Sequence, residues 1–473
     1  MSFLVDSYFR VPEAAAFLRV HPEIIKHLCQ QGRIPAEKVQ STWLIQKEKL
    51  MEFAATYCNP RRVNAAPQSL QSRIDRSELQ WPGERICVNG SRIEEANLRQ
   101  KLLQMLSAQG FTLADDQVIP PDQTDKDKIR QLYAHLRLER LEEAKHWLLS
   151  VERKLLPYFA DGSEVKPEKI RPHLEPVDAQ WKADLFRYAS LTWSVPVSAG
   201  YGRRMRFLVF DESNEKLMGL FALGDPVYNL RARDQWIGWG VQEKNERLYH
   251  VMDAYVLGAM PPYSYLLGGK LVAMLTTSNE VREEFTKRYG KRASVIRGVV
   301  RQPHLVLITT TSALGRSSIY NRISFEGRKT FISLGFTEGW GHFHFSDGTF
   351  EQVKAYLREI GDPVVERYKY GGGPNWRFRV VKQCLIYLGL SPDLLKHGVK
   401  REVFVAPLAE NAREFLRGEV SEPRYYSMPM KDLFAYFRER WLLPRAARDQ
   451  RYSSFKKGLL CLSSLLNSPH YRG

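Results

Sequence analysis

At 473 residues, with 44% hydrophobic and 12% aromatic content, the chain is long enough for several folded units and too apolar to be disordered throughout. Seventy Lys and Arg against 53 Asp and Glu give a net charge of +17, which favours a polyanionic partner, nucleic acid foremost. Five scattered cysteines without a C-x-x-C pair, no signal-peptide start and no apolar run of membrane-span length indicate a cytoplasmic protein without a zinc ribbon, disulfide framework or membrane segment.

Residues 1–58 are predicted to form a winged helix-turn-helix DNA-binding domain. Apolar residues at helical spacing indicate two short helices, and Gly32 ends the second one. The segment IPAEKVQSTWLI then gives a wing that closes on Trp43, before a last helix from Lys47. This stretch resembles the helix-turn-helix of excisionase and MerR-like proteins. The residues predicted to contact DNA bases or phosphates are His21, Lys26, His27, Gln30, Arg33 and Lys38. A helical unit for protein interaction is the alternative.

A linker and a helical arm are predicted next. Residues 59–90 are polar and contain several prolines and arginines, as expected of a linker. Residues 91–180 are predicted to form a helical arm, with helices over 93–109 and 126–156. The second of these alternates Arg, Lys and Glu with apolar residues, which indicates a helix packed on one face. A coiled coil that makes a homo-oligomer is the alternative.

Residues 181–360 are predicted to form an α/β core with a mixed sheet. The stretch 206–224 indicates a hairpin of two apolar strands around a polar turn. The apolar run 251–260 indicates a buried strand, because its β-branched and aromatic content suits a sheet and two prolines follow it.

A glycine turn follows that strand. Gly268 and Gly269 predict a turn into one helix that runs to about residue 285, with a strand over 305–310 and a short helix near 320 after it. The segment FISLGF gives a last strand. This order of elements resembles the GNAT acyltransferase fold, which implies a mixed-sheet core whose glycine loop binds acyl-CoA.

Residues 361–473 are predicted to be a C-terminal α/β and basic extension that is separate from the core. YGGGPNWRFR precedes a helix over 380–388, and a strand over 401–407 and a short helix over 409–416 follow. The end of the chain is rich in Arg and Lys, which favours non-specific contact with phosphates.

A longer resemblance is carried by motifs such as FADGSEV, LTWSVPVSAGYGRRMRFLV, GDPVYNLRARDQWIGW, DAYVLGAMPPYSYLLGGKL, TTTSALGRSSIYNR and GPNWRFR. These motifs resemble the DruA family, which is found in Druantia anti-phage systems and in proteins associated with mobile elements. The resemblance covers most of the chain after the first hundred residues. It implies a defence or mobile-element context and leaves the biochemical activity open.

The glycine turn is the predicted site of chemistry. Backbone N–H groups at a helix N-terminus favour a phosphate, and Lys270 follows the two glycines directly. Loops at the carboxyl ends of neighbouring strands are expected to meet there in one crevice. The predicted catalytic residues are Asp225, Asp253, Tyr263, Lys270, Arg316 and Tyr320. A tyrosine could attack a phosphodiester, or carboxylates could hold Mg²⁺ or Mn²⁺ for hydrolysis. In the structural alternative, Asp253 and Tyr320 satisfy buried backbone groups.

Arginines around the predicted core are expected to bind nucleic acid. They are Arg203, Arg204, Arg231, Arg233, Arg322, Arg377 and Arg379. A second, weaker metal candidate is the pair His342 and His344, whose rings would share one face of a strand.

The function predicted from the sequence is a DNA-binding protein of a mobile element or an anti-phage defence locus. We expect it to process DNA by strand cleavage or transfer, as transposases and recombinases do, with DNA and other proteins of the same locus as partners. The alternatives are a non-enzymatic DNA-recognition and recruitment subunit, and a GNAT-like acyltransferase that acts on DNA or protein.

Overall fold

The chain divides into two compact units, which are considered separately: an N-terminal unit, Met1–Val88, and a core unit, Asn89–Gly473. The computed structural model describes residues 8–11, 13, 14, 25, 29, 34–39, 42–56, 91–114, 117–119, 125–197, 202–290, 300, 302–339, 345, 347–367 and 376–467.

The described part of the N-terminal unit contains a three-stranded sheet in the order β1-β3-β2. Its elements are β1 (Tyr8–Arg10), β2 (Ala36–Val39), β3 (Thr42–Gln46) and α3 (Lys47–Thr56). The β2–β3 hairpin places Trp43 opposite Lys38, which confirms the predicted wing and the helix that follows it. Apolar side chains make its small core: Val11, Ala14, Ile25, Cys29, Ile34, Ile45 and Leu50.

The helix predicted to enter the DNA groove cannot be compared with the structure. His21, Lys26, His27, Gln30 and Arg33 lie outside the described residues, as does the side chain of Lys38. Their DNA contacts stay a prediction.

Among the described residues of the core unit, seven strands form one mixed sheet in the order β13-β14-β10-β9-β8-β7-β6. The strands are β6 (Pro172–Pro176), β7 (Arg204–Asp211), β8 (Lys216–Gly224), β9 (Val251–Ala259), β10 (Leu307–Thr311), β13 (Ile332–Phe336) and β14 (Glu402–Pro407). β9 and β10 run parallel, whereas the other neighbours are antiparallel. Apolar residues occupy both faces of β7 and β8, so these strands are buried on both sides.

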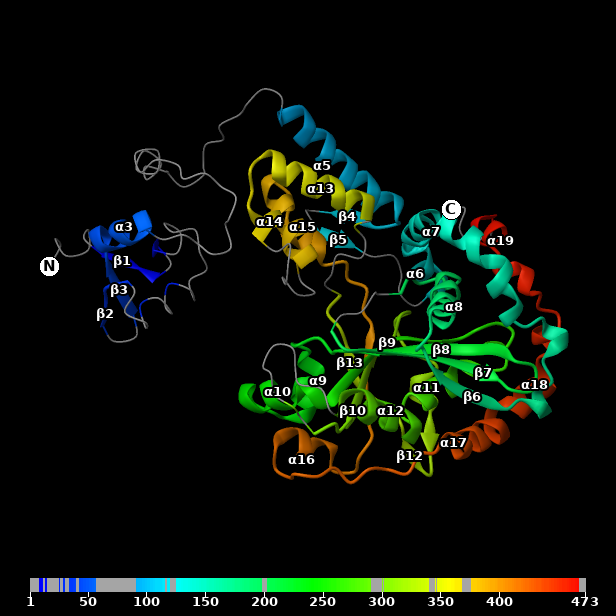
Figure 1. The fold of residues 1–473 in the computed structure, drawn as a ribbon. Helices are drawn as coiled ribbons and strands as arrows, with labels where there is room; N and C mark the ends of the chain where they lie inside the picture. The colour runs from blue at the N-terminus through cyan, green and yellow to red at the C-terminus, as the bar shows by residue number, and fades with distance from the viewer. Residues whose placement is uncertain are drawn as a thin grey trace. The chain divides into compact units, whose positions relative to one another are not determined.

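Helices cover both faces of this sheet (Figure 1). On one face lie α11 (Gly268–Leu275), α12 (Asn279–Tyr289) and α17 (Met430–Phe437), which share a core with Phe207, Phe221 and Phe404 of the strands. On the other lie α7 (Ala134–Leu155), α8 (Gln180–Leu191) and α19 (Leu462–Asn467). Three short helices pack at the end where β9 begins: α9 (Arg231–Ile237), α10 (Val241–Arg247) and α16 (Ala412–Arg417).

A separate group of helices has its own apolar core. Figure 1 draws most of these helices beside the sheet. It combines α5 (Ser91–Ala108) and α6 (Lys126–Leu132) with α13 (Asp347–Glu359), α14 (Val364–Arg367) and α15 (Trp376–Tyr387). Helices from the predicted arm and from the predicted C-terminal extension therefore share one core.

Most predicted elements are present, but the helix predicted over 126–156 is two helices, α6 and α7, and two further predictions need correction. The helix predicted to run to residue 285 is two helices, because the hydroxyls of Thr276 and Thr277 bond to carbonyls of α11 and Ser278 caps α12. The boundary predicted at residue 360 falls inside one sheet, since β14 pairs with both β13 and β10. Local sequence patterns cannot reveal such a long-range insertion.

Candidate nucleic-acid groove

The predicted glycine-loop crevice is covered by protein. Lys270 is 6% exposed, and its Nζ donates to the carbonyl oxygens of Ile319 at 3.3 Å and Ser318 at 3.5 Å. The Nζ also lies 5.2 Å from the centre of the Trp441 ring. A Cβ on Gly268 would stand 2.8 Å from the Tyr263 carbonyl oxygen, so this glycine serves a close internal approach of the backbone.

The burial of Lys270 also changes its pKa. Loss of hydration, together with the nearby charges of Arg322 and Arg440, lowers the pKa of Lys270 to about 8. The lysine holds the 318–319 segment onto α11, and a Cβ on Gly269 would stand 3.3 Å from the Ile319 side chain. The catalytic role predicted for Lys270 therefore receives no support from an accessible surface.

Tyr263 faces a different part of the fold. Its hydroxyl donates to Asp211 Oδ2 at 3.1 Å and accepts from Asn214 Nδ2 at 2.9 Å. These contacts fasten the start of the glycine segment to the β7–β8 turn. Burial raises the pKa of Tyr263, with the neighbouring Asp211 carboxylate acting in the same direction.

Asp225 lies at the opposite end of the strands. It binds Arg203 through Nε at 2.7 Å and through the backbone N–H at 2.8 Å, and the Arg203 guanidinium stacks 4.2 Å from the Tyr249 ring centre. The expectation that these loops meet is wrong, because β8 is antiparallel to β9 and its last residue, Gly224, pairs with Asp253. The loop after β8 therefore lies at the start of β9 instead of its end.

Two other groups of predicted site residues, around Arg233 and in the serine-rich motif after β10, make hydrogen bonds within the protein. Arg233 is fully buried and donates to Asp234 Oδ1 at 2.7 and 2.9 Å and to the carbonyls of Val227 and Tyr228. The neighbouring Arg231 is exposed.

The serine-rich motif after β10 is held by one carboxylate. Glu402, which is 4% exposed, accepts from the Ser317 N–H at 2.8 Å and from Asn321 Nδ2 at 2.9 and 3.0 Å. These hydrogen bonds are among the causes that keep the pKa of Glu402 below its ordinary value, although burial opposes them. Arg316 and Arg322 extend from this motif to the surface.

The structure brings two of the predicted catalytic residues together at a fork in the sheet. β9 and β10 pair only from Val251 to Asp253 and from Leu307 to Thr309, and beyond this point β10 continues beside β14 alone. At the split, Thr309 Oγ1 donates to Asp253 Oδ1 at 2.6 Å, and Thr310 Oγ1 donates to the Ala254 carbonyl at 2.9 Å. Hydrogen bonds from the threonine side chains thus join the two strands where their backbone pairing ends.

The fork also perturbs its titratable groups. Burial raises the pKa of Asp253 to about 6, against the opposing effects of the Thr309 hydrogen bond and the Arg233 charge. Burial and the Asp253 charge raise the pKa of Tyr320 to about 12, although a hydrogen bond with Thr310 acts against this. A carboxyl whose pKa is raised in this way is a candidate functional group.

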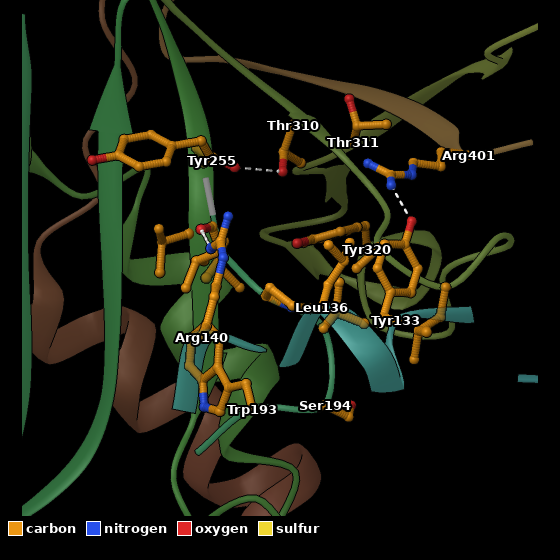
Figure 2. A pocket seen from close by; sticks show the side chains of 18 of the residues that line it. Tyr133, Leu136, Arg140, Trp193, Ser194, Tyr255, Thr310, Thr311, Tyr320 and Arg401 are labelled. Carbon is orange, nitrogen blue, oxygen red and sulfur yellow. Dashed lines mark hydrogen bonds between the residues drawn. The ribbon is translucent and has the colours of Figure 1, made fainter. Parts of the chain in front are cut away.

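Two adjoining cavities are lined in part by β9. The first, of about 550 Å³, lies in the fork and is called the fork cavity (Figure 2). Its lining includes Tyr133, Leu136, Arg140, Trp193, Ser194, Val195, Thr310, Thr311, Leu314, Tyr320, Phe345, Arg377 and Arg401. The second, of about 510 Å³, is called the arginine cavity. Its lining includes Arg137, Arg140, Glu143, Phe186, Arg187, Trp193, Arg204, Arg206 and Tyr255. We refer to the two together as the groove.

A strap formed by residues 193–197 lies between the two cavities and lines both. It is held by α7, since Arg137 Nε donates to the Trp193 carbonyl at 3.1 Å and Arg140 Nη1 donates to the Val197 carbonyl. A Cβ on Gly258 of β9 would stand 2.8 Å from the Trp193 ring, so a glycine lets the indole lie against the strand. Arg140 and the strap therefore join the cavities into one surface.

The groove is basic. Seven arginines line it, whereas Glu143 is the one carboxylate among the described lining residues. Arg140 donates to a carbonyl, Arg187 lies 4.0 Å from the Trp147 ring centre and Arg206 lies 5.8 Å from that of Phe186. These three side chains contact carbonyls and rings, and make no ion pair with a carboxylate in the part of the chain that the structure describes.

Sequence reasoning found only part of this groove. Of the predicted nucleic-acid residues, Arg204 and Arg377 line it, whereas Arg203, Arg231, Arg233 and Arg322 lie elsewhere and Arg379 is exposed on α15. The missed residues are Arg137, Arg140, Arg187, Arg206 and Arg401. A signal was available on α7, where residues 136, 137, 140 and 144 share one helical face.

Within the described ranges, no three His, Cys, Asp or Glu side chains lie close enough together to hold a metal ion, and His342 and His344 are outside those ranges. No helix in the described part of the chain has the length and apolar character needed to cross a membrane.

Comparison with known proteins gives three findings. Residues 123–418 match the family described as Druantia protein DruA, and residues 8–57 match a helix-turn-helix domain family. The chain is 45% identical over 366 residues to Druantia protein DruA of Escherichia coli (strain UMEA 4076-1), covering 77% of this chain and 91% of that relative. No solved structure matches the fold, so the resemblance to GNAT acyltransferases is not confirmed.

Proposed function

Because this chain belongs to the DruA family, we propose that it is a DNA-binding protein of an anti-phage defence system whose core unit grips a nucleic-acid strand in the groove. The helix-turn-helix unit would bind duplex DNA, as such domains do. The observation that carries the proposal for the core is the convergence of seven arginines and several aromatic rings with a single carboxylate.

Arginine and aromatic side chains together suit nucleic acid better than other polyanions. Guanidinium groups bind phosphate oxygens through paired hydrogen bonds, and aromatic rings stack on bases. Trp193, Tyr255 and Phe186 lie among the arginines of the arginine cavity, so both kinds of contact are available on one surface. The mixture favours a strand with accessible bases.

The test is the salt dependence of binding to single-stranded DNA. We expect the double variant Arg140→Gln/Arg206→Gln to bind a thymidine oligonucleotide more weakly than wild type. Because two phosphate contacts are lost, the slope of log affinity against log salt should fall by about 1.4. Fluorescence anisotropy at several salt concentrations measures both effects.

A matched control removes the same charge elsewhere. Arg231→Gln/Arg322→Gln changes two exposed arginines outside the groove and should leave both affinity and slope near the wild-type values. If this control weakens binding as much as the groove variant does, the attraction comes from the net charge of the protein and the groove proposal fails.

A second, enzymatic function is favoured by the fork. Tyr320 lines a cavity that would hold the strand, Asp253 directly precedes the lining residue Ala254, and a carboxyl with a pKa of about 6 can exchange a proton near neutral pH. We propose strand cleavage or transfer in which the Tyr320 oxygen attacks a phosphorus atom and its proton passes to Asp253. The bond to the leaving oxygen then breaks as Asp253 passes this proton to that oxygen, which gives a tyrosyl phosphodiester and a strand that ends in a hydroxyl.

A covalent-adduct assay distinguishes this enzymatic function from a recruitment subunit. Wild-type protein incubated with labelled single-stranded DNA should give a denaturation-resistant adduct, Tyr320→Phe should give none, and Asp253→Asn should give it more slowly. Tyr228→Phe is the control, because this tyrosine is exposed and is not among the residues that line either cavity. DNA binding without an adduct in wild type would support the non-enzymatic alternative.

A further inference from the structure

Resting on the groove proposed above, we infer that the fork cavity receives one unpaired nucleobase while the arginine cavity holds the phosphates next to it. The substrate of the core would then be a single strand or a nucleotide turned out of a duplex. The inference rests on differences in size, lining and position between the two cavities.

The fork cavity has the lining of a site for a flat, apolar group. Tyr133, Trp193, Tyr320 and Phe345 supply aromatic rings, and aliphatic side chains such as Leu136 fill the spaces between them. A volume of about 550 Å³ lies in the range of small-molecule sites, so a nucleotide fits but a duplex does not. Base stacking on aromatic rings is a main source of affinity for unpaired nucleic acid.

The polar groups of this cavity suit the edge of a base. Thr311 brings a hydroxyl to its wall, whereas the Thr310 hydroxyl already donates to the Ala254 carbonyl, and the cavity runs along β9 from Ala254 to Leu257. This part of β9 has no partner in β10, because their pairing ends at Asp253. Backbone groups on the edge of a strand are donors and acceptors with fixed directions, as recognition of a base edge requires.

The arginines lie where the phosphates next to a bound base would be. The arginine cavity adds Arg137, Arg187, Arg204 and Arg206 to Arg140, which both cavities share. The strap lies at their junction, so its Trp193 ring can stack on the base while the phosphates run along the arginines. Burial raises the pKa of Tyr255 even though Arg204 and Arg206 lie near it, so its hydroxyl remains a neutral donor in the phosphate region at neutral pH.

The experiment compares two five-nucleotide probes that have the same phosphates. One is a thymidine pentamer, and the other is the same deoxyribose-phosphate chain without bases. Full-length wild-type protein should bind the thymidine pentamer about tenfold more tightly, since stacking of one base contributes about 1–3 kcal/mol. Both probes should give the same dependence on salt.

A pair of leucine variants on α7 tests whether the preference comes from the fork cavity. Leu136→Trp fills the cavity and should reduce the preference to less than twofold without changing binding of the base-free chain. Leu149→Trp makes the same change on the same helix at a side chain that is 61% exposed, and it should keep the tenfold preference. If Leu136→Trp does not fold, as judged by circular dichroism, Trp193→Ala takes its place and should reduce the preference in the same way.

The outcomes separate the two proposals. Equal binding of both probes by wild type, with the salt slope still dependent on Arg140 and Arg206, would overturn the base site and leave the groove proposal standing. A preference that survives both Leu136→Trp and Trp193→Ala would also overturn it, because the base would then be held elsewhere. Loss of the base-dependent preference in the cavity variant alone is the result that the inference predicts.

Discussion

The start of α11 at Gly268, Gly269 and Lys270, called the glycine corner, and the groove both contain cationic side chains but use them differently. At the glycine corner, Lys270 is buried, donates to two carbonyls and lies beneath Trp441. In the groove, Arg140, Arg187 and Arg206 reach cavities that are open to solvent. A glycine-lysine pattern at a helix start can therefore serve packing, whereas arginines that are far apart in sequence can make the accessible basic surface.

The difference follows from the partners that each cation finds within the fold. Arg233 and Arg203 have acidic partners in Asp234 and Asp225 and become part of the internal structure. Arginines of α7, α8 and β7 instead extend toward a region where Glu143 is the one acidic residue among the described lining. A basic surface with so few carboxylates is available to bind an anionic ligand.

The largest expected effect comes from removing the guanidinium of Arg233, which is bound within the fold. Arg233→Met removes a buried guanidinium together with its hydrogen bonds to two carbonyls and to Asp234, which keeps Trp239 and Lys244 as donors. We expect a loss of about 3–5 kcal/mol in the free energy of unfolding, measured by urea denaturation. Arg231→Met, two residues away and exposed, should change it by less than about 0.5 kcal/mol. Equal effects would mean that the buried contacts of Arg233 do not stabilise the fold.

The next effect concerns the fork and depends on pH. The pKa of Asp253 is about 6 in the folded protein and near 4 when unfolded, so the folded state binds the proton more tightly. The stabilisation from this proton is present below pH 4 and is lost as pH rises to 6. Relative to Asp253→Asn, wild type should therefore lose on the order of 2 kcal/mol of stability between pH 4 and pH 7.

Urea denaturation of both proteins at pH 4, 5, 6 and 7 measures this change. The amide that Asp253→Asn introduces cannot ionise but keeps an oxygen that accepts the Thr309 hydrogen bond, so the variant isolates the effect of the charge. A difference in stability that stays constant across this range would show that Asp253 ionises normally.

A pair of tyrosine variants sharpens the comparison further. Tyr263→Phe removes the buried hydroxyl that joins Asp211 to Asn214, and it should cost about 1–3 kcal/mol of stability while DNA affinity stays unchanged. Tyr255→Phe, at the groove, should leave stability unchanged and weaken DNA binding about fivefold. Thermal unfolding and anisotropy measure the two properties, and the reverse pattern would place the DNA at the glycine corner.

The smallest expected effect is at the rim of the groove. Arg187 is exposed and stacks on Trp147, so Arg187→Gln should remove one phosphate contact and lower the salt slope by about 0.7. Stability should change by less than about 0.5 kcal/mol. A fall in slope as large as that of the double variant Arg140→Gln/Arg206→Gln would require the strand to follow a different path.

Local patterns in the sequence predicted many elements of the fold. The apolar hairpin, the strand before the two prolines and the wing around Trp43 all follow from alternation and turn residues. The position of β14 in the sheet did not, because pairs such as Ile332 with Val405 depend on contacts far apart in the chain. The convergence of loops was also mispredicted, since sequence alone did not give the antiparallel direction of β8 next to β9.

The groove was harder to predict than the fold for a physical reason. On α7, Arg137 and Arg140 alternate with Glu139, Glu142 and Glu143, a pattern that usually marks a solvated helix face. Only the packing of this helix over β9 shows which of these charges reach a cavity. Asp253 and Tyr320 were predicted as polar residues that meet near the glycine turn, and the structure brings them together at the fork instead.

Photocrosslinking tests the central claim most directly. Full-length protein bound to a single-stranded oligonucleotide containing 5-iodouracil is irradiated, digested and analysed by mass spectrometry. The account predicts crosslinks at aromatic residues of the groove, namely Tyr133, Trp193, Tyr255 and Tyr320. Crosslinks confined to residues 1–88, or located at Trp441 beside Lys270, would contradict it.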